Sequence, residues 1–302
     1  MPSLAEHLNW RVKGWRHARL ARGVLDTPPL RGQDDGVVIF SMIGTRVLLP
    51  YLVAVKSFGR SLGRGRVVVL DDGTLTADDR AVLRRHLDPE LLSIADVDTG
   101  ACPTGGTWER LLTILDRRRD AYVIQLDSDT VTVGDTDEIR AAIDANRSFS
   151  LRGEAGAELL SAPAFAAARA PLPPGRAHVQ RAFEAVVEQV RVPDLRYFRG
   201  CSGFAGFARG GAGRNLAEQV SAQGQRLLGL ARWREWGTEQ LTSNLVIANE
   251  PDPLLLPYGR YLNFWDEGVP ADARLVHFLG TCRFNGETYL RATRDAIARL
   301  SA

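Results

Sequence analysis

Two aspartates separated by one serine, Asp127 and Asp129, follow the apolar run of residues 121–126. A run of that length bounded by polar residues is typical of a buried strand. In open α/β sheets, ligands bind at the carboxyl ends of the strands, which is where these two carboxylates fall. Carboxylates spaced i, i+2 across a tight turn can share a hard divalent cation that bridges to substrate phosphates. Because Asp and Ser also favour strand-ending turns, the motif alone is compatible with a metal site and with a simple turn.

Strands and helices alternate around this motif, and they must position it. Apolar runs predict strands at residues 37–42, 66–70, 91–95, 121–126 and 148–151. Helices are predicted between them at residues 46–58, 76–87 (with Thr76 as N-cap), 107–118 and 136–145. Further strands are expected at 203–208, 253–257 and 274–278, with helices at 177–190, 213–224, 239–249 and 287–300. This alternation predicts an α/β fold with a mostly parallel sheet flanked by helices.

The predicted domain organisation is simple. Residues 1–35 are interpreted as a basic helical extension and residues 36–302 as one domain. Within that domain, residues 154–175 are rich in alanine and proline and are interpreted as a surface excursion, because segments typical of strands resume after it.

Composition narrows the classes of function. With 45% hydrophobic and 25% charged residues the chain is typical of a globular protein, and a net charge of +2 gives no case for nucleic-acid binding. No apolar run approaches the roughly 20 residues of a membrane-spanning helix. Three widely spaced cysteines, Cys102, Cys201 and Cys282, argue against a disulfide framework or a structural zinc site and favour the cytoplasm.

The segment of residues 4–23 has a helical apolar face surrounded by basic residues. That face would contain Leu4, Leu8, Val12, Trp15 and Leu20. Such a helix can lie on an anionic membrane surface, or it can dock on its own domain. Membrane contact would place the protein peripherally at the inner face of the membrane and would favour a lipid-linked acceptor for a transfer reaction.

Four short segments resemble one enzyme family. They are the segment 126–131 around the aspartates, the Gly-Cys-Ser-Gly-Phe segment 200–204, the Glu-Gln-Leu-Thr-Ser-Asn segment 239–244 and the His-Phe-Leu-Gly segment that begins at 277. Their order is similar to that of the retaining GT-A glycosyltransferases of the glycogenin and bacterial galactosyltransferase type, carbohydrate family eight. The resemblance covers residues 36–285. The sequence departs from the family's pattern at Cys201 (for Asn), Glu239 (for Asp) and Arg283 (for Lys), and it lacks a final Pro-Trp pair.

The resemblance implies a GT-A (Rossmann-like) fold and a metal-dependent transfer from a nucleotide-diphosphate sugar, with UDP as the expected nucleotide. It implies that Mn²⁺ or Mg²⁺ is held by Asp127, Asp129 and His277, and that Asp127 and Ser128 also face the donor. Such a cation acts as a Lewis acid toward the diphosphate leaving group. A core histidine at a strand end is the structural alternative for His277.

Further residues of the family's donor site can be carried over. Arg283 and Gly280 would approach the diphosphate, and an arginine fork suits phosphate as well as an ammonium does. Ser202 and Gly203 would line the sugar pocket, and Glu239 and Gln240 would act beside the anomeric carbon. The structural alternatives are a surface arginine, tight strand packing and an acid in the first turn of a helix.

Three more residues would contact the donor. Ser41 and Asp71, near the ends of the first two strands, would contact the nucleoside, and Arg110 matches a donor-contacting basic residue of the family. Residues 71–74 are also a good turn sequence.

The expected reaction moves the sugar to a glycan, lipid-linked or other acceptor, with retention of configuration as the family implies. An inverting reaction would need a carboxylate base, for which Glu239 is available.

Other classes remain open. A haloacid-dehalogenase-type phosphatase also has Asp-x-Asp after a buried strand, but it needs a later lysine and none follows Lys56. A sugar-nucleotide pyrophosphorylase would need a glycine at Met42. A non-catalytic nucleotide-sugar-binding relative is compatible with Cys201 and the absent Pro-Trp pair.

Overall fold

The computed structural model describes residues 4–171 and 175–302, and of residues 4–9 and Thr281 only the backbone. The chain forms two compact units. The first contains residues up to Ser93, Ile124–Ala141 and Pro257–Ala302, and the second contains Ile94–Val123 and Ala142–Leu256. The division into an extension of residues 1–35 and a domain of residues 36–302 stays a prediction.

The main sheet has seven strands. Four of them, in the order β4-β1-β2-β3, belong chiefly to the first unit. The strands are β1 (Val37–Ile43), β2 (Arg66–Asp71), β3 (Glu90–Ser93) and β4 (Tyr122–Leu126). β1 pairs in parallel with β2, and β2 with β3, so that Ile43 lies opposite Asp71. Nearly every residue of β1 and β4 is buried, which explains why both strands read as continuous apolar runs. The strands expected at 37–42, 66–70 and 121–126 are confirmed.

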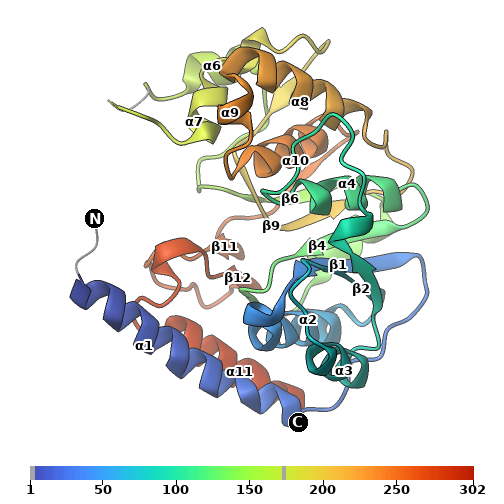
Figure 1. Cartoon of the computed structure of the whole chain (residues 1–302), viewed down its shortest axis with the longest axis vertical. Coiled ribbons are helices and arrows are strands. Elements are labelled where there is room, and N and C mark those ends of the chain that lie inside the picture. Colours follow the sequence, from blue (N-terminus) through green and yellow to red (C-terminus); the bar gives the residue numbers. More distant parts are fainter. Residues whose placement is uncertain (1–3, 172–174) are drawn as a thin grey trace. The chain divides into compact units, whose positions relative to one another are not determined.

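Helices of the first unit pack on this sheet and on each other. They are α1 (Leu4–Ala21), α2 (Leu48–Leu62), α3 (Ala77–His86) and α11 (Thr288–Ser301), with 3-10 turns η1 (Arg22–Asp26), η2 (Thr45–Val47) and η5 (Gly280–Cys282). α1 runs alongside α11, and both contact α2 (Figure 1). α3 begins at a capping box formed by Thr76 and Asp79, which confirms the predicted N-cap.

A second, three-stranded sheet lies in the first unit and was not fully expected. It has the order β11-β12-β5, formed by Tyr261–Asn263, Leu275–His277 and Thr130–Thr132. β12 is antiparallel to β5 and parallel to β11. β12 corresponds to the strand expected at 274–278. β5 and β11 have three residues each, of which one and two are apolar, so neither shows a pattern of its own, whereas β12 lies in the longer apolar stretch 274–278.

The second unit contains the strands in the order β10-β6-β9. β6 (Phe149–Arg152) is antiparallel to the fully buried β9 (Gly200–Phe207) and parallel to β10 (Leu254–Leu255). Its helices include α4 (Trp108–Arg117), α8 (Asn215–Leu228), α9 (Leu230–Trp233) and α10 (Thr238–Ala248). α10 packs on β9, α4 and α8. α5 (Asp137–Asp144) begins in the first unit and ends in the second, and the turn η3 (Ile94–Asp96) follows β3.

One expectation for the second unit needs correction, and another gains detail. The helix expected at 177–190 is broken into α7 (Val179–Glu184) and η4 (Val187–Gln189). The interpretation of 154–175 as a surface excursion stays a prediction, and that segment contains β7 (Leu160–Ser161), which pairs with β8 (Arg196–Tyr197), and α6 (Ala162–Ala168). Ser161 caps α6 and Pro163 stands in its first turn, where proline is tolerated. Residues 172–174 of that segment lie outside the described residues.

The face of α1 that docks on the first unit differs from the predicted apolar face. Gly14 lies against Phe284, and His17 and Ala21 are buried, whereas Val12 and Trp15 are exposed. The predicted Leu20 is half-buried, and the side chains of Leu4 and Leu8 lie outside the described atoms. Among residues 4–171 and 175–302, no helix combines the length and the apolar character needed to cross a membrane.

Candidate functional site

The small sheet of the first unit brings His277 to the aspartate motif. β5 starts one residue after Asp129, and its first residue, Thr130, pairs with His277 at the end of β12. The amide of Phe278 donates to the carbonyl of Asp129 at 2.8 Å, which closes this ladder. An antiparallel ladder thereby joins two segments that are about 150 residues apart in sequence.

Asp127, Asp129 and His277 form a cluster with the composition of a cation site. One ligand atom from each residue lies within 4.8 Å of the others. Asp129 is 9% exposed and His277 5% exposed, whereas Asp127 is half-buried. Two carboxylates with one imidazole fit Mn²⁺, which accepts both oxygen and nitrogen, and the carboxylates alone suit Mg²⁺. The three residues predicted as metal ligands are thus brought together.

Asp129 lies between the imidazole of His277 and the guanidinium of Arg283. The Nε2 atom of His277 is 3.2 Å from its Oδ1, and the guanidinium of Arg283 donates to its Oδ2. Burial acts to raise the pKa of the Asp129 carboxyl, but His277, Arg283 and hydrogen bonds to the carboxylate outweigh it and hold the pKa below its usual value. The carboxylate is therefore ionised at neutral pH, as a metal ligand must be.

Asn263 orients the ring of His277. β11 is parallel to β12 with Asn263 opposite His277, and the Nδ1 of the histidine lies 3.0 Å from the Oδ1 of the asparagine. Because an amide oxygen only accepts, Nδ1 donates to Asn263, and Nε2 is directed at Asp129. Metal-binding histidines are commonly fixed in this way by an acceptor on the second ring nitrogen. No sequence motif pointed to Asn263; its signal is the short apolar run Tyr261–Asn263 that forms β11.

Arg283 borders a cavity of about 180 Å³ beside the cluster. The Nε of Arg283 donates to the carbonyl of Phe278 at 2.8 Å, which holds the guanidinium toward Asp129. Ser128 also lines this cavity, as does His17 from α1. Burial, aided by the charge of Arg283, lowers the pKa of His17 to about 4, so this ring is neutral at pH 7. The structure therefore adds α1 to the surroundings of the predicted donor residues.

Ser41 and Asp71 both form hydrogen bonds within the protein. The hydroxyl of Ser41 donates to the carbonyl of Leu126 at 2.7 Å, which ties the ends of β1 and β4 together just before Asp127. Asp71 accepts from the amide of Gly73 at 2.8 Å and pairs with Arg80 at 2.6 Å, as expected for a turn. Their contact with a nucleoside stays a prediction.

Gly280 opens the turn η5 with a φ of +56°, in the left-handed region that glycine adopts most readily. A Cβ atom there would meet no other atom within 4 Å. The glycine is therefore required for its backbone conformation rather than for space, which is compatible with the predicted approach of backbone amides to a phosphate.

The second unit gathers another group of the predicted residues. Arg110 of α4 pairs with Glu239 of α10 at 3.0 Å and donates to the hydroxyl of Ser202 on β9 at 3.2 Å. Thr107 donates to the same Glu239 oxygen at 2.9 Å. Its φ of +72° is rare for a residue with a branched Cβ, and such strain is found at functional sites. No sequence motif pointed to Thr107.

Gln240 and Gly203 complete this group. The side-chain oxygen of Gln240 lies 3.3 Å from the amide of Ser202, and its nitrogen donates to Gln180 at 3.3 Å. Gly203 is buried within β9. The predicted residues therefore form two clusters, each within one unit: Asp127, Asp129, His277 and Arg283 in the first, and Arg110, Ser202, Glu239 and Gln240 in the second.

Comparison with solved structures shows what this fold resembles. The bifunctional glycosyltransferase WbbM, in its apo structure, matches with a TM-score of 0.54 and 16% identity over 88% of this chain. This chain spans only 50% of the length of that protein. Mouse xyloside xylosyltransferase 1, in its apo form, matches with a TM-score of 0.43 and 13% identity, covering 85% of this chain and 100% of that one.

Sequence comparison adds no relative. No protein-family model matches the chain, and no curated protein matches its sequence. At 16% identity the likeness to WbbM extends to the fold alone. It confirms the α/β fold with a mostly parallel sheet flanked by helices, as expected for a GT-A glycosyltransferase.

Proposed function

We propose that this protein is a metal-dependent glycosyltransferase that transfers a sugar from a nucleotide-diphosphate sugar, with UDP as the expected nucleotide. The observation that carries the proposal is the convergence of Asp127, Asp129 and His277 within 4.8 Å at the end of β4. The fold likeness to WbbM supports it. The acceptor is a hydroxyl of a glycan, a lipid-linked sugar or another molecule, and the expected compartment is the cytoplasm.

In this proposal, Asp127, Asp129 and His277 hold Mn²⁺ or Mg²⁺, which when bound neutralises the charge that develops on the diphosphate leaving group. Asn263 keeps Nε2 of His277 directed at the site. Arg283 adds a guanidinium that forms paired hydrogen bonds with phosphate oxygens. Gly280 supports the backbone turn between His277 and Arg283.

The reaction exchanges one bond at the anomeric carbon. The bond from that carbon to the diphosphate oxygen breaks, and its electron pair leaves with the nucleoside diphosphate. The acceptor oxygen forms the new bond and gives its proton to the departing phosphate, which gives retention because attack and departure use the same face. In the second unit, Glu239 accepts from both Arg110 and Thr107. A carboxylate that already accepts hydrogen bonds from a guanidinium and a hydroxyl is a poor general base, which supports retention over inversion.

The residues of the second unit are proposed to serve the sugar side of the reaction, by the resemblance of their sequence segments. Gln240 and Ser202 offer an amide and a hydroxyl, the polar groups that fix sugar hydroxyls in binding sites. Glu239 and Gln240 are proposed to act beside the anomeric carbon, and Arg110 to hold Glu239 in place.

The test measures release of nucleoside diphosphate from a panel of nucleotide sugars with Mn²⁺, with Mg²⁺ and with chelator. We expect metal-dependent release from one class of donor, reduced on the order of 10²-fold or more in Asp127→Asn and in His277→Ala. Asp34→Asn and His178→Ala are matched controls, because both side chains are exposed and outside the clusters. Both control variants should keep wild-type activity.

Other results would redirect the assignment. Metal-dependent nucleotide-sugar binding without any release, with or without candidate acceptors, would indicate the non-catalytic relative. Hydrolysis of phosphomonoesters with no response to nucleotide sugars would indicate the phosphatase class. Full activity of Asp127→Asn in the presence of chelator would refute the metal site.

A further inference from the structure

The outer side of α1 carries both apolar and basic side chains that are exposed. Val12 is 49% exposed and Trp15 is 62% exposed, and both lie on the side of α1 opposite to the buried His17. Arg11, Arg19 and Arg22 follow the same helical spacing, since residues three, four and seven positions apart share one side of a helix. All three arginines are exposed. We call Arg11, Val12, Trp15 and Arg19 of α1, together with Arg22 at the start of η1, the outer face.

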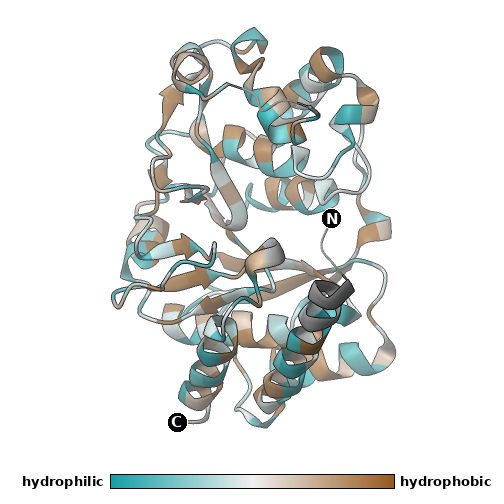
Figure 2. Cartoon of the chain, turned by 90° about the vertical axis from the view of Figure 1, so that its left-hand side faces the viewer, coloured by the Kyte–Doolittle hydropathy of each residue, from teal (hydrophilic) through white to brown (hydrophobic). Residues whose placement is uncertain are grey.

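This outer face is positively charged. Among the described residues, Arg11, Arg19 and Arg22 form no ion pair, whereas the neighbouring Arg16 is paired with Glu287 at 2.9 Å. Figure 2 shows hydrophilic and hydrophobic residues mixed along the side of α1 that faces the viewer. Unpaired cations beside an exposed indole are the combination that interfacial helices use on anionic lipids.

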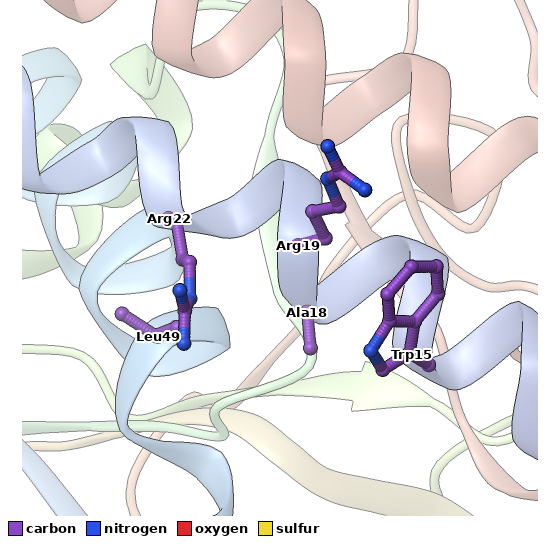
Figure 3. Close-up of a pocket in the computed structure, with 5 residues that line it drawn as sticks. All are labelled: Trp15, Ala18, Arg19, Arg22 and Leu49. Carbon is purple, nitrogen blue, oxygen red and sulfur yellow. The ribbon is translucent and has the colours of Figure 1, made fainter.

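A pocket of about 460 Å³ lies on this face, between α1 and α2. Its lining consists of Trp15, Ala18, Arg19, Arg22 and Leu49 (Figure 3). The guanidinium carbon of Arg19 lies 5.7 Å from the centre of the Trp15 ring, within range of a cation–π contact. Figure 3 shows the guanidinium of Arg22 directed toward Leu49 and that of Arg19 extending away from it, so the lining combines apolar side chains with two separate cations.

The pocket adjoins the predicted donor site. Ala18 and Leu49 line this pocket and also line the cavity that contains Asp129 and Arg283. α1 and α2 therefore separate the two hollows, and a surface bound to the outer face would lie about one helix diameter, roughly 10–12 Å, from the metal cluster.

We infer that the outer face of α1 binds the surface of an anionic phospholipid bilayer, with Arg11, Arg19 and Arg22 attracted to lipid phosphates and Trp15 inserted among the head groups. Charge complementarity selects this occupant, because three exposed arginines, with no ion pair to any residue that the structure describes, repel a basic surface and are attracted to anionic lipid. Tryptophan is favoured at the membrane interface, where its ring is partly apolar and its N–H stays hydrated. The inference does not depend on the proposed transferase activity.

The experiment is cosedimentation of the full chain with vesicles of phosphatidylcholine alone and of phosphatidylcholine mixed with phosphatidylglycerol. We expect binding to the mixed vesicles and little binding to the neutral ones. Arg19→Glu with Arg22→Glu should weaken binding by at least about 25-fold, from about fivefold per removed charge. Trp15→Ala should weaken it by about tenfold without changing its dependence on phosphatidylglycerol.

Matched variants elsewhere test whether the outer face is responsible. Trp236, 68% exposed in the second unit, is replaced by Ala, and Arg119 and Arg234, both exposed there, are replaced by Glu. These variants should bind vesicles as the wild type does. The inference would be overturned if the control variants lost as much vesicle binding as the outer-face variants. It would also be overturned if the wild type did not bind the mixed vesicles.

A second readout separates lipid binding from the nucleotide site. The melting temperature and the response to UDP with Mn²⁺ are measured for each variant, and both should stay at wild-type values because the three substituted side chains lie outside the metal cluster. A wild-type protein that self-associates through this face and binds no mixed vesicles, with the dimer lost in the arginine variant, would also contradict the inference.

Discussion

At the scale of single residues, the site is organised around the charge of Asp129. Its carboxylate contacts both His277 and Arg283, and the charge of Arg283 already offsets the negative charge that would attract a cation. A metal ion must therefore compete with Arg283 for Oδ2 of Asp129. A diphosphate offers the guanidinium another partner, which couples the binding of nucleotide to the binding of metal.

This competition predicts that removing Arg283 has opposite effects on Mn²⁺ affinity and on UDP affinity. Arg283→Met should tighten Mn²⁺ binding in the absence of nucleotide by about tenfold, because a positive charge within a few ångströms of the site is lost. The same variant should weaken UDP binding in the presence of saturating Mn²⁺ by a similar factor. Calorimetric titration of each ligand measures both effects.

Arg283→Lys serves as the conservative control, because lysine keeps the charge but cannot form the paired bonds of a guanidinium. It should restore UDP binding in part and leave Mn²⁺ affinity near the wild-type value. Weaker Mn²⁺ binding in Arg283→Met would show that Arg283 supports the metal site rather than competing with it.

At the scale of secondary structure, the three-stranded sheet determines where His277 lies. β5 follows Asp129 directly, β12 ends at His277, and β11 places Asn263 beside the same histidine. Three short strands thus set both the position and the orientation of the imidazole. A ligand held on paired strands is positioned more rigidly than one on a free loop.

The position of Asn263 predicts an effect on metal affinity without any direct contact with metal. Asn263→Ala should weaken Mn²⁺ binding by roughly 10–100-fold, because His277 loses the acceptor that fixes its ring. Asn263→Asp keeps an acceptor at Nδ1 and should recover most of the affinity. Electron paramagnetic resonance or calorimetry with Mn²⁺ reports the change directly.

Asn285→Ala is the matched control, since Asn285 lies in the same unit and donates to Asp266 on the surface. It should leave Mn²⁺ affinity unchanged. An equal effect of Asn263→Ala and Asn285→Ala, or no rescue by Asn263→Asp, would contradict a positioning role for Asn263.

The sequence predicts the long elements of this protein better than the short ones. β1, β4, α2 and α3 carry continuous apolar runs, helical periodicity or a capping box, and each lies close to its expected bounds. β5 and β11 have three residues each, and their existence depends on pairing with β12, a contact between distant segments. Asn263 escaped prediction for the same reason.

The predicted face of α1 illustrates a second limit. Hydrophobic spacing selected Val12 and Trp15, but the docking side contains Gly14, His17 and Ala21. Small residues and a neutral histidine pack there against α11 and Phe284, because the close approach of two helices needs little side-chain volume. Such a face has a weak apolar signal in the sequence.

At the scale of the whole molecule, the chain divides its candidate residues between two compact units. The first unit holds the cluster suited to a cation and a diphosphate, with Asp129 at its centre. The second holds the buried Arg110–Glu239 pair with Gln240 beside it. Glycosyl transfer from a nucleotide sugar requires both kinds of group, one for the leaving group and one for the sugar.

Asp127, Asp129 and His277 are proposed to bind a divalent cation that also binds the diphosphate of a nucleotide. The most direct measurement is a calorimetric titration of UDP into the protein with Mn²⁺ and with chelator, for the wild type, Asp129→Asn and the exposed control Asp34→Asn. We expect UDP binding at least tenfold tighter with Mn²⁺, the same in Asp34→Asn and lost in Asp129→Asn. UDP binding that is equal with chelator, or unchanged in Asp129→Asn, would contradict this account.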